Sequence, residues 1–338
     1  MTFDPMWLLA AFGGGLFGAA VGGLPAFILC GIAAIIGAGI NLATGDPTFS
    51  NQIAWGPILG PQISFAGGAA AAVYAQRIGK LANGRDIATA LMGLDRPDVL
   101  LVGGLFGGIG YLLWLAFANI PAIGDTGATN PIALSIVVNA LIARVAFGKT
   151  GPFGRVRMGD NRWRPSEVAS WLPWQSHPNQ LLLLGLGAGI AVSWTTVQVP
   201  ALAAIWFGFA AAGLIFLQYG TKVPVWHHVA LASEQVIVVA GGDIWWGVTF
   251  AVMAAFIGEF YACLFTAHGD SHIDPPSASL ATTFTIMAVL AYVGAFDLTG
   301  APVIAIGVGV AVVGYGVMTF LRRRPNAAVA VAPSSAAV

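Results

Sequence analysis

The chain has 338 residues, of which 57% are hydrophobic and 8% are charged. Soluble domains carry about 25% charged residues, so this composition predicts an integral membrane protein whose partner is the lipid bilayer. Lys plus Arg equals Asp plus Glu at 14 each. This zero net charge, without a basic domain, argues against nucleic acid as a partner.

The first half of the chain contains four long apolar runs. The run at 6–40 is too long for one membrane-spanning helix, which needs about 20 apolar residues. The stretch "VGGLPAF" at 21–27 should divide it into two helices, because Pro25 lacks a backbone donor and glycine is a weak helix former. The remaining runs predict helices at 55–78, 99–118 and 131–147.

The second half is predicted to contain six helices, one more than the first half. The run at 180–218 is interrupted by "VQVPAL" around Pro200, which predicts a second broken pair. Further helices are predicted at 228–241, 244–266, 276–296 and 301–321. The expected fold is an all-α, polytopic membrane protein with about eleven transmembrane helices.

Three short motifs recur in the same order in the two halves. "LPAF" at 24–27 resembles "VPAL" at 199–202, and "PQISFAGG" from Pro61 resembles "EQVIVVAGG" from Glu234. "GDTGATNP" from Gly124 resembles "GDSHIDPP" from Gly269. A repeat of five helices is odd, so the second copy should be inverted in the membrane, as in many secondary transporters that bind solutes at broken or re-entrant helices.

This organisation gives five predicted segments. They are a first transmembrane repeat at 1–150, a cytoplasmic interfacial linker at 151–178, a second, inverted repeat at 179–299, an extra helix at 300–324 and a disordered tail at 325–338.

Positive charges predict the orientation. Lys and Arg gather in the connection at 77–96, in the linker and at 322–324, whereas the connections at 41–54 and 120–130 contain none. Because cytoplasmic loops are enriched in Lys and Arg, we expect the N-terminus outside and the C-terminus in the cytoplasm of a cell whose inner membrane holds the protein.

The "GDTGATNP" and "GDSHIDPP" motifs each end at a predicted helix start. Asn or Asp followed by Pro is typical of a helix N-terminus. If the segments before them fold back into the membrane, two helix N-termini face one another at depth; otherwise they are capped helices at opposite membrane surfaces. The candidate substrate or ion ligands are the polar residues Asp125, Thr126, Asn130, Asp270, Ser271 and Asp274.

Two acids and two amides lie inside apolar runs. Glu234 and Glu259 are candidates for proton or cation coupling, because an intramembrane acid usually faces a bundle interior or a pathway; protonated structural residues are the alternative. Gln62 and Gln235 correspond across the repeats and are candidates for substrate binding or for helix packing. Arg144 is expected to extend its charge to the cytoplasmic surface.

Histidines and aspartates alternate in "HGDSHID" from His268 to Asp274. In extended backbone, His268, Asp270, His272 and Asp274 would lie on one side. Imidazole and carboxylate suit a transition metal, with His268 and His272 as candidate ligands, although a solvated loop or a pH sensor fits the same pattern.

The function predicted from these patterns is secondary transport of a small solute by alternating access, coupled to protons or a cation. Metal-ion transport belongs to the same hypothesis, and the alternatives are a passive channel for a small solute or ion, or a membrane-embedded subunit or enzyme. The sequence offers no nucleophile constellation, so we do not expect an enzyme, and no cofactor beyond a bound cation is predicted. A homo-oligomer is compatible with the pattern.

Overall fold

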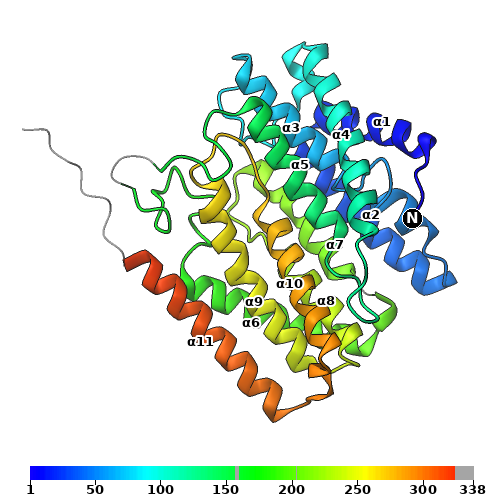
Figure 1. The fold of residues 1–338 in the computed structure, drawn as a ribbon, viewed down its shortest axis with the longest axis vertical. Coiled ribbons are helices and arrows are strands. Elements are labelled where there is room, and N and C mark those ends of the chain that lie inside the picture. Colours follow the sequence, from blue (N-terminus) through cyan, green and yellow to red (C-terminus); the bar gives the residue numbers. More distant parts are fainter. Residues whose placement is uncertain (157–159, 203, 324–338) are drawn as a thin grey trace, which may run out of the picture.

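The computed structural model describes residues 1–156, 160–202 and 204–323, and within them the chain is all-helical (Figure 1). The predicted disordered tail and Arg324 lie outside the described residues. The helices of the first half are α1 (Pro5–Val21), α2 (Gly23–Thr44), α3 (Ser64–Arg77), α4 (Pro97–Ala118) and α5 (Pro131–Phe147). Those of the second half are α6 (Pro178–Gln198), α7 (Ile205–Ala212), α8 (His227–Val239), α9 (Ile244–Tyr261), α10 (Pro275–Tyr292) and α11 (Ala301–Arg323).

Local sequence explains most of these boundaries. Asp4 accepts hydrogen bonds from the backbone N–H groups that follow it, and Pro5 occupies the first helical position of α1. Gly22, at a φ of 96°, separates α1 from α2 within the predicted break. In the second half, Ala204 adopts a φ of 75° immediately before α7, which continues into a 3-10 segment at Gly213–Tyr219.

The prediction of a helix over 55–78 is wrong in its first part. The α-helix begins only at Ser64, preceded by a π-helical turn at Ser50–Ala54. Pro57 and Pro61 lack backbone donors and, with two nearby glycines in "GPILGPQ", interrupt the apolar run. The length of the apolar run therefore overestimated the length of this helix.

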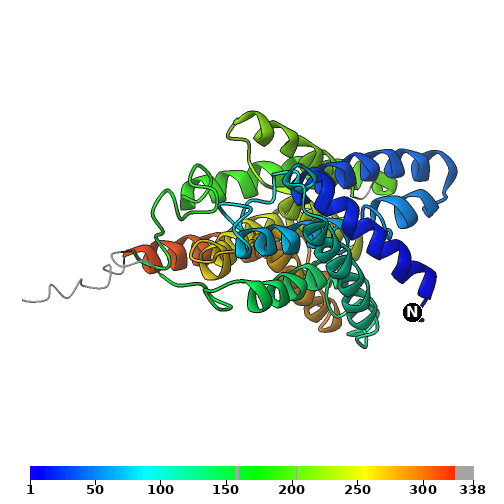
Figure 2. The ribbon, with the colours of Figure 1, turned by 90° about the horizontal axis from the view of Figure 1, so that it is seen from above.

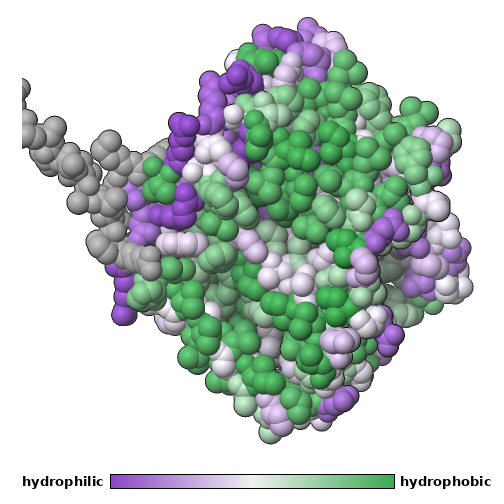
Figure 3. Space-filling model, viewed as in Figure 1, coloured by the Kyte–Doolittle hydropathy of each residue, from purple (hydrophilic) through white to green (hydrophobic). Residues whose placement is uncertain are grey.

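Among the described residues, six segments are long and apolar enough to cross a membrane: Gly23–Thr44, Pro97–Ala118, Pro178–Gln198, Pro200–Tyr219, Ile244–Thr266 and Ala301–Arg323. Figure 3 shows hydrophobic side chains over most of one face, with hydrophilic residues gathered towards its edges. These features identify a membrane protein, as the composition predicted.

The two halves use the same helix pairings. Helix α1 packs against α3 and α4, and α6 packs in the same way against α8 and α9. Likewise α5 packs against α3 and α4, while α10 packs against α8 and α9. Two further contacts, α2 with α7 and α5 with α10, join the halves. Figure 2 shows the bundle from above.

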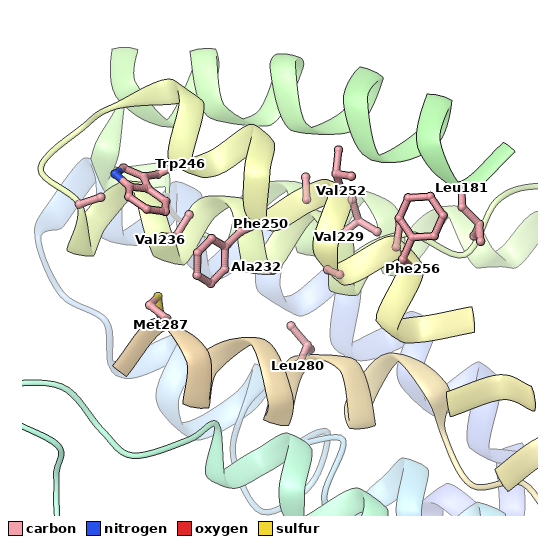
Figure 4. Packing of buried hydrophobic residues seen from close by; sticks show 14 of the residues in the cluster. Leu181, Val229, Ala232, Val236, Trp246, Phe250, Val252, Phe256, Leu280 and Met287 are labelled. Atoms are coloured by element: carbon pink, nitrogen blue, oxygen red, sulfur yellow. The ribbon is translucent and has the colours of Figure 1, made fainter. Parts of the chain in front are cut away.

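The largest hydrophobic cluster lies in the second half, where α9 is the central helix. Trp246, Phe250 and Phe256 of α9 pack among side chains of α6, α8 and α10 (Figure 4). Helix α11 covers the outer side of α9 and is itself mostly exposed. This cluster holds α8 and α10, which carry residues of the candidate site described below.

Candidate functional site

Helices α5 and α10 begin with matching caps. The side-chain oxygen of Asn130 accepts a hydrogen bond from the backbone N–H of Ala133 at 2.9 Å. Asp274 accepts one from the backbone N–H of Ser277 at 2.9 Å and another from its hydroxyl at 2.5 Å. Proline follows each cap, so both starts have the local structure that the sequence indicated.

The two helices run antiparallel and overlap through their N-terminal halves (Figure 1). The hydroxyl of Thr129 donates to the carbonyl oxygen of Ala281, in the second turn of α10, at 3.0 Å. Val137, halfway along α5, packs in one cluster with Ile273 and Ala278 at the start of α10. Each helix therefore begins beside the middle of the other.

Arg144 fixes the segment that precedes α10. Its side chain is fully buried, and the guanidinium donates to the Ser271 hydroxyl and to the carbonyl oxygens of Ser271, Phe265 and Pro152 at 2.5–3.1 Å. The expectation that Arg144 reaches the membrane surface is wrong, because carbonyl groups on both sides of the buried side chain, from Pro152, Phe265 and Ser271, accept hydrogen bonds from its guanidinium. An arginine followed by more apolar residues inside a helix was the signal that could have indicated this inward role.

The two Gly-Asp motifs have unlike surroundings. Asp270 accepts hydrogen bonds from the backbone N–H of Lys149 at 2.5 Å and from the Thr150 hydroxyl at 2.7 Å. Asp125 is exposed and Thr126 is partly exposed, in a turn before α5. Asp270 thus joins the end of α5 to the segment before α10, whereas its counterpart faces outwards.

The four alternating residues from His268 to Asp274 do not share one side. Nε2 of His268 lies 3.1 Å from the carbonyl oxygen of Arg162 in the linker, while Nε2 of His272 lies 3.2 Å from Oδ1 of Asp274. Burial lowers the pKa of His268 below its usual value. Within the described ranges, no group of three or more His, Cys, Asp or Glu side chains is placed to hold a metal ion. The predicted one-sided array is wrong, because the segment turns rather than running extended.

Two cavities lie beside the overlapping helix starts. The first has a volume of about 240 Å³ and reaches Asn83 and Arg85 of the α3–α4 connection and Trp171 of the linker. Its wall also contains His272, Asp274 and Ser277.

The second cavity has a volume of about 250 Å³ and lies towards the N-terminal end of α5. Asn130 and Gln235 contribute polar groups to it, and Trp55 and Pro61 contribute parts of the α2–α3 connection. The first cavity reaches the connections that follow α3 and α5, whereas the second reaches residues that precede these helices. The cavities therefore approach the centre from opposite ends of α3 and α5.

Four residues belong to the walls of both cavities. They are Phe27 of α2, Ile136 of α5, His227 of α8 and Ser277 of α10. The rings of Phe27 and His227 are 4.7 Å apart between centroids. A single layer of side chains from four helices thus separates the two spaces. Sequence reasoning missed Phe27 and Ile136, because an apolar residue in an apolar helix carries no distinguishing signal.

The predicted coupling acids lie outside this layer. The carboxylate of Glu234 accepts hydrogen bonds from the backbone N–H groups of Trp206 at 2.8 Å and Phe207 at 3.4 Å, so it caps the start of α7. Glu259 forms an ion pair with Arg322 of α11 at 2.6 Å. Both acids have structural partners that join separate helices.

The two matched glutamines also differ in position. Gln235 lines the second cavity. Gln62 is fully buried, and its Nε2 donates to the carbonyl oxygen of Trp55 at 3.1 Å. Of the predicted ligands, Asn130 and Gln235 line the second cavity, whereas Asp274 lines the first.

Comparison with known proteins gives one family. No curated protein and no solved structure gives a significant match to the chain. The model of a family of unknown function, DUF7973, matches the chain twice, at residues 1–159 and at residues 154–306. The two matches cover most of the sequence, and the chain therefore belongs to this family of unknown function, DUF7973.

Proposed function

We propose that the protein is a secondary transporter for a small solute, built from two inverted repeats of five helices with α11 added. The double match of one family model and the repeated helix pairings support the duplication. The antiparallel packing of α5 and α10, which occupy equivalent places in the two copies, supports the inversion. Transporters with this organisation bind solutes where broken helices of the repeats meet near the membrane centre.

The observation that carries the proposal is the pair of cavities separated by one layer of side chains. A site that opens to one side at a time needs such a layer, because a continuous pore would let solute pass without conformational change. Each cavity has the volume of about eight water molecules at about 30 Å³ each, which suits a solute of metabolite size or smaller. Polar groups at the central layer would orient it.

The proposed setting is the inner membrane, with eleven spans, the N-terminus outside and the C-terminus in the cytoplasm. The first cavity then faces the cytoplasm, since the connections that reach it carry Arg85 and the basic linker. The second cavity faces outside, next to connections without Lys or Arg.

Cysteine accessibility tests this function without knowledge of the solute. Two single-cysteine proteins, Leu217→Cys for the first cavity and Ile132→Cys for the second, would be made in a background with Cys30 and Cys263 replaced by alanine. Each is treated with a membrane-impermeant maleimide in oriented vesicles. We expect any condition that raises the reactivity of one cysteine to lower that of the other.

Flux measurements then identify the solute and the coupling. Proteoliposomes containing the pH dye pyranine are given a panel of small carboxylates, amines, amino acids and divalent cations. A solute-dependent change of internal pH that a protonophore abolishes would support coupled transport. Simultaneous reactivity of both cysteines with downhill flux alone would indicate a passive channel and overturn the proposal.

A further inference from the structure

We propose, on the basis of the transport function proposed above, that His227 binds and releases the coupled proton, and that Asp274 is its counter-charge. His227 occupies the first position of α8 and belongs to the layer between the cavities. Among the described residues that form this layer, it is the one titratable side chain. Its position gives the imidazole contact with both spaces, which a coupling residue requires.

The hydrogen bonding of His227 leaves room for a ligand. The residue is only 5% exposed, and within the described part of the chain its Nδ1 atom is buried without a hydrogen-bond partner. A buried polar atom without a partner costs about 1–3 kcal/mol, and a water molecule or ligand in the adjoining cavity would remove this cost. Glu234 and Glu259 are less suited, because the N-terminus of α7 and Arg322 already engage them.

The charged surroundings favour a positive charge at this point when the first cavity is hydrated. Asp274 of α10 lines that cavity next to His227, and its carboxylate also contacts His272. Arg85 opposes a positive charge from the same wall, although its guanidinium is directed to backbone carbonyls such as that of Ala169 at 3.0 Å. On α8 itself, the neighbouring ring of His228 lies 5.7 Å away.

Aromatic rings connect His227 to the helices that join the two halves. Its ring centroid lies 4.7 Å from that of Phe27 on α2 and 5.7 Å from that of Phe207 on α7. A cation within about 6 Å of an aromatic ring is attracted by the electron density of the ring face. Because α2 packs directly against α7, a change of charge at His227 acts on this contact between the halves.

The proposed step is a simple proton transfer. Water in one cavity gives a proton to the free lone pair of the neutral imidazole, and the imidazolium is stabilised by the Asp274 carboxylate. After the layer rearranges, the imidazolium returns the proton to water in the other cavity. One proton crosses the layer in each cycle: an O–H bond of hydronium in one cavity breaks as the N–H bond forms, and the N–H bond breaks as water in the other cavity becomes hydronium.

The test compares His227→Gln with His228→Gln. Glutamine keeps a polar side chain of moderate size but does not bind a proton near neutral pH. His228 is a matched control, since it is adjacent, 1% exposed and also has a buried Nδ1 for which the described residues provide no partner. It differs in facing Gly258 of α9 and in lining neither cavity. The readout is the reactivity of the cysteines at positions 217 and 132 between pH 5 and pH 9.

We expect pH to shift reactivity from one cysteine to the other in the parent protein and in His228→Gln. In His227→Gln the ratio of the two reactivities, in which the rise of thiolate with pH cancels, should be independent of pH, and proton-coupled accumulation should fall at least tenfold. A pH-dependent exchange that persists in His227→Gln would overturn the assignment of His227 but leave alternating access intact. Absence of any reciprocal exchange in the parent would overturn the transport function itself.

A second variant separates charge from folding. Asp274→Asn retains a good helix cap for α10, since asparagine caps as well as aspartate, but it removes the counter-charge. The pH midpoint of the exchange should move to more acidic pH by about 1–3 units. An unchanged midpoint would overturn the role of Asp274. Histidine NMR of selectively labelled protein in nanodiscs, with His227→Gln to assign the signal, reports protonation directly even if a variant is less active.

Discussion

Close contact between α1 and α4 depends on glycine, and the substitution Gly15→Ala tests this dependence. A Cβ atom at Gly15 would lie 2.2 Å from the carbonyl oxygen of Gly103 and 2.8 Å from Cα of Gly107, both on α4. Ala11 and Ala19 flank Gly15 at four-residue spacing, so the small residues of α1 face the small residues of α4. In membranes, such small-residue faces let helix backbones approach closely.

The magnitude follows from this geometry. Real Cβ atoms essentially never approach another heavy atom closer than 3.0 Å, so the two helices would have to separate by nearly 1 Å. Inserting a methyl group into a packed interface costs about 1–3 kcal/mol. Gly13→Ala is the matched control, because Gly13 lies on the same helix and a Cβ there meets no described atom within 4 Å. Alanine at this exposed helical position should stabilise the fold by up to about 1 kcal/mol.

Thermal unfolding of the two variants in the same detergent, followed by size-exclusion chromatography after heating, measures the difference. Gly15→Ala should unfold at a lower temperature than the parent and Gly13→Ala at the same or a higher one, which corresponds to a difference of about 1–4 kcal/mol in unfolding free energy. Equal unfolding temperatures for the two variants would refute the close approach of α1 and α4.

Three further predictions concern polar contacts. Arg144→Gln should destabilise the protein by about 3–5 kcal/mol, because it leaves buried carbonyl groups without a donor; the fraction of monodisperse protein after heating measures this. Asp270→Asn should lower the unfolding temperature and the proposed transport activity by more than Asp125→Asn does. The reason is that the Asp270 carboxylate contacts Lys149 and Thr150 after the end of α5, whereas Asp125 is exposed. Glu259→Gln and Arg322→Met should each speed hydrogen exchange in α11, and the double variant should resemble the single ones.

Several helix starts could be predicted from local sequence. The starts of α5 and α10 follow from Asn-Pro and Asp-Pro, because capping and proline act within one turn of the chain. The break at Gly22 was equally local. The late start of α3 was missed, since its apolar run concealed two prolines that interrupt it.

The candidate site was less predictable because its contacts join distant parts of the chain. Arg144 and Ser271 are 127 residues apart in sequence, and no periodicity indicates that they meet. Hydropathy placed Glu259 deep in a span but did not reveal that Arg322 accompanies it. The alternation of histidine and aspartate from His268 to Asp274 misled because it is a visible pattern without a structural counterpart. A two-residue period places side chains on one side only in extended backbone.

The two Gly-Asp motifs, which occupy corresponding places in the proposed repeats, lead into helix caps of different charge. In the first half, α5 is capped by a neutral residue, Asn130, after a turn that leaves Asp125 exposed. In the second half, α10 is capped by Asp274, after a buried segment that Arg144 holds in place. Since both helix N-termini offer similar backbone donors, the carboxylate determines the difference in electrostatic potential between the cavities. A proton at His227 is therefore favoured more when the layer exposes it to the Asp274 side, and this bias gives the proposed cycle a preferred state at acidic pH.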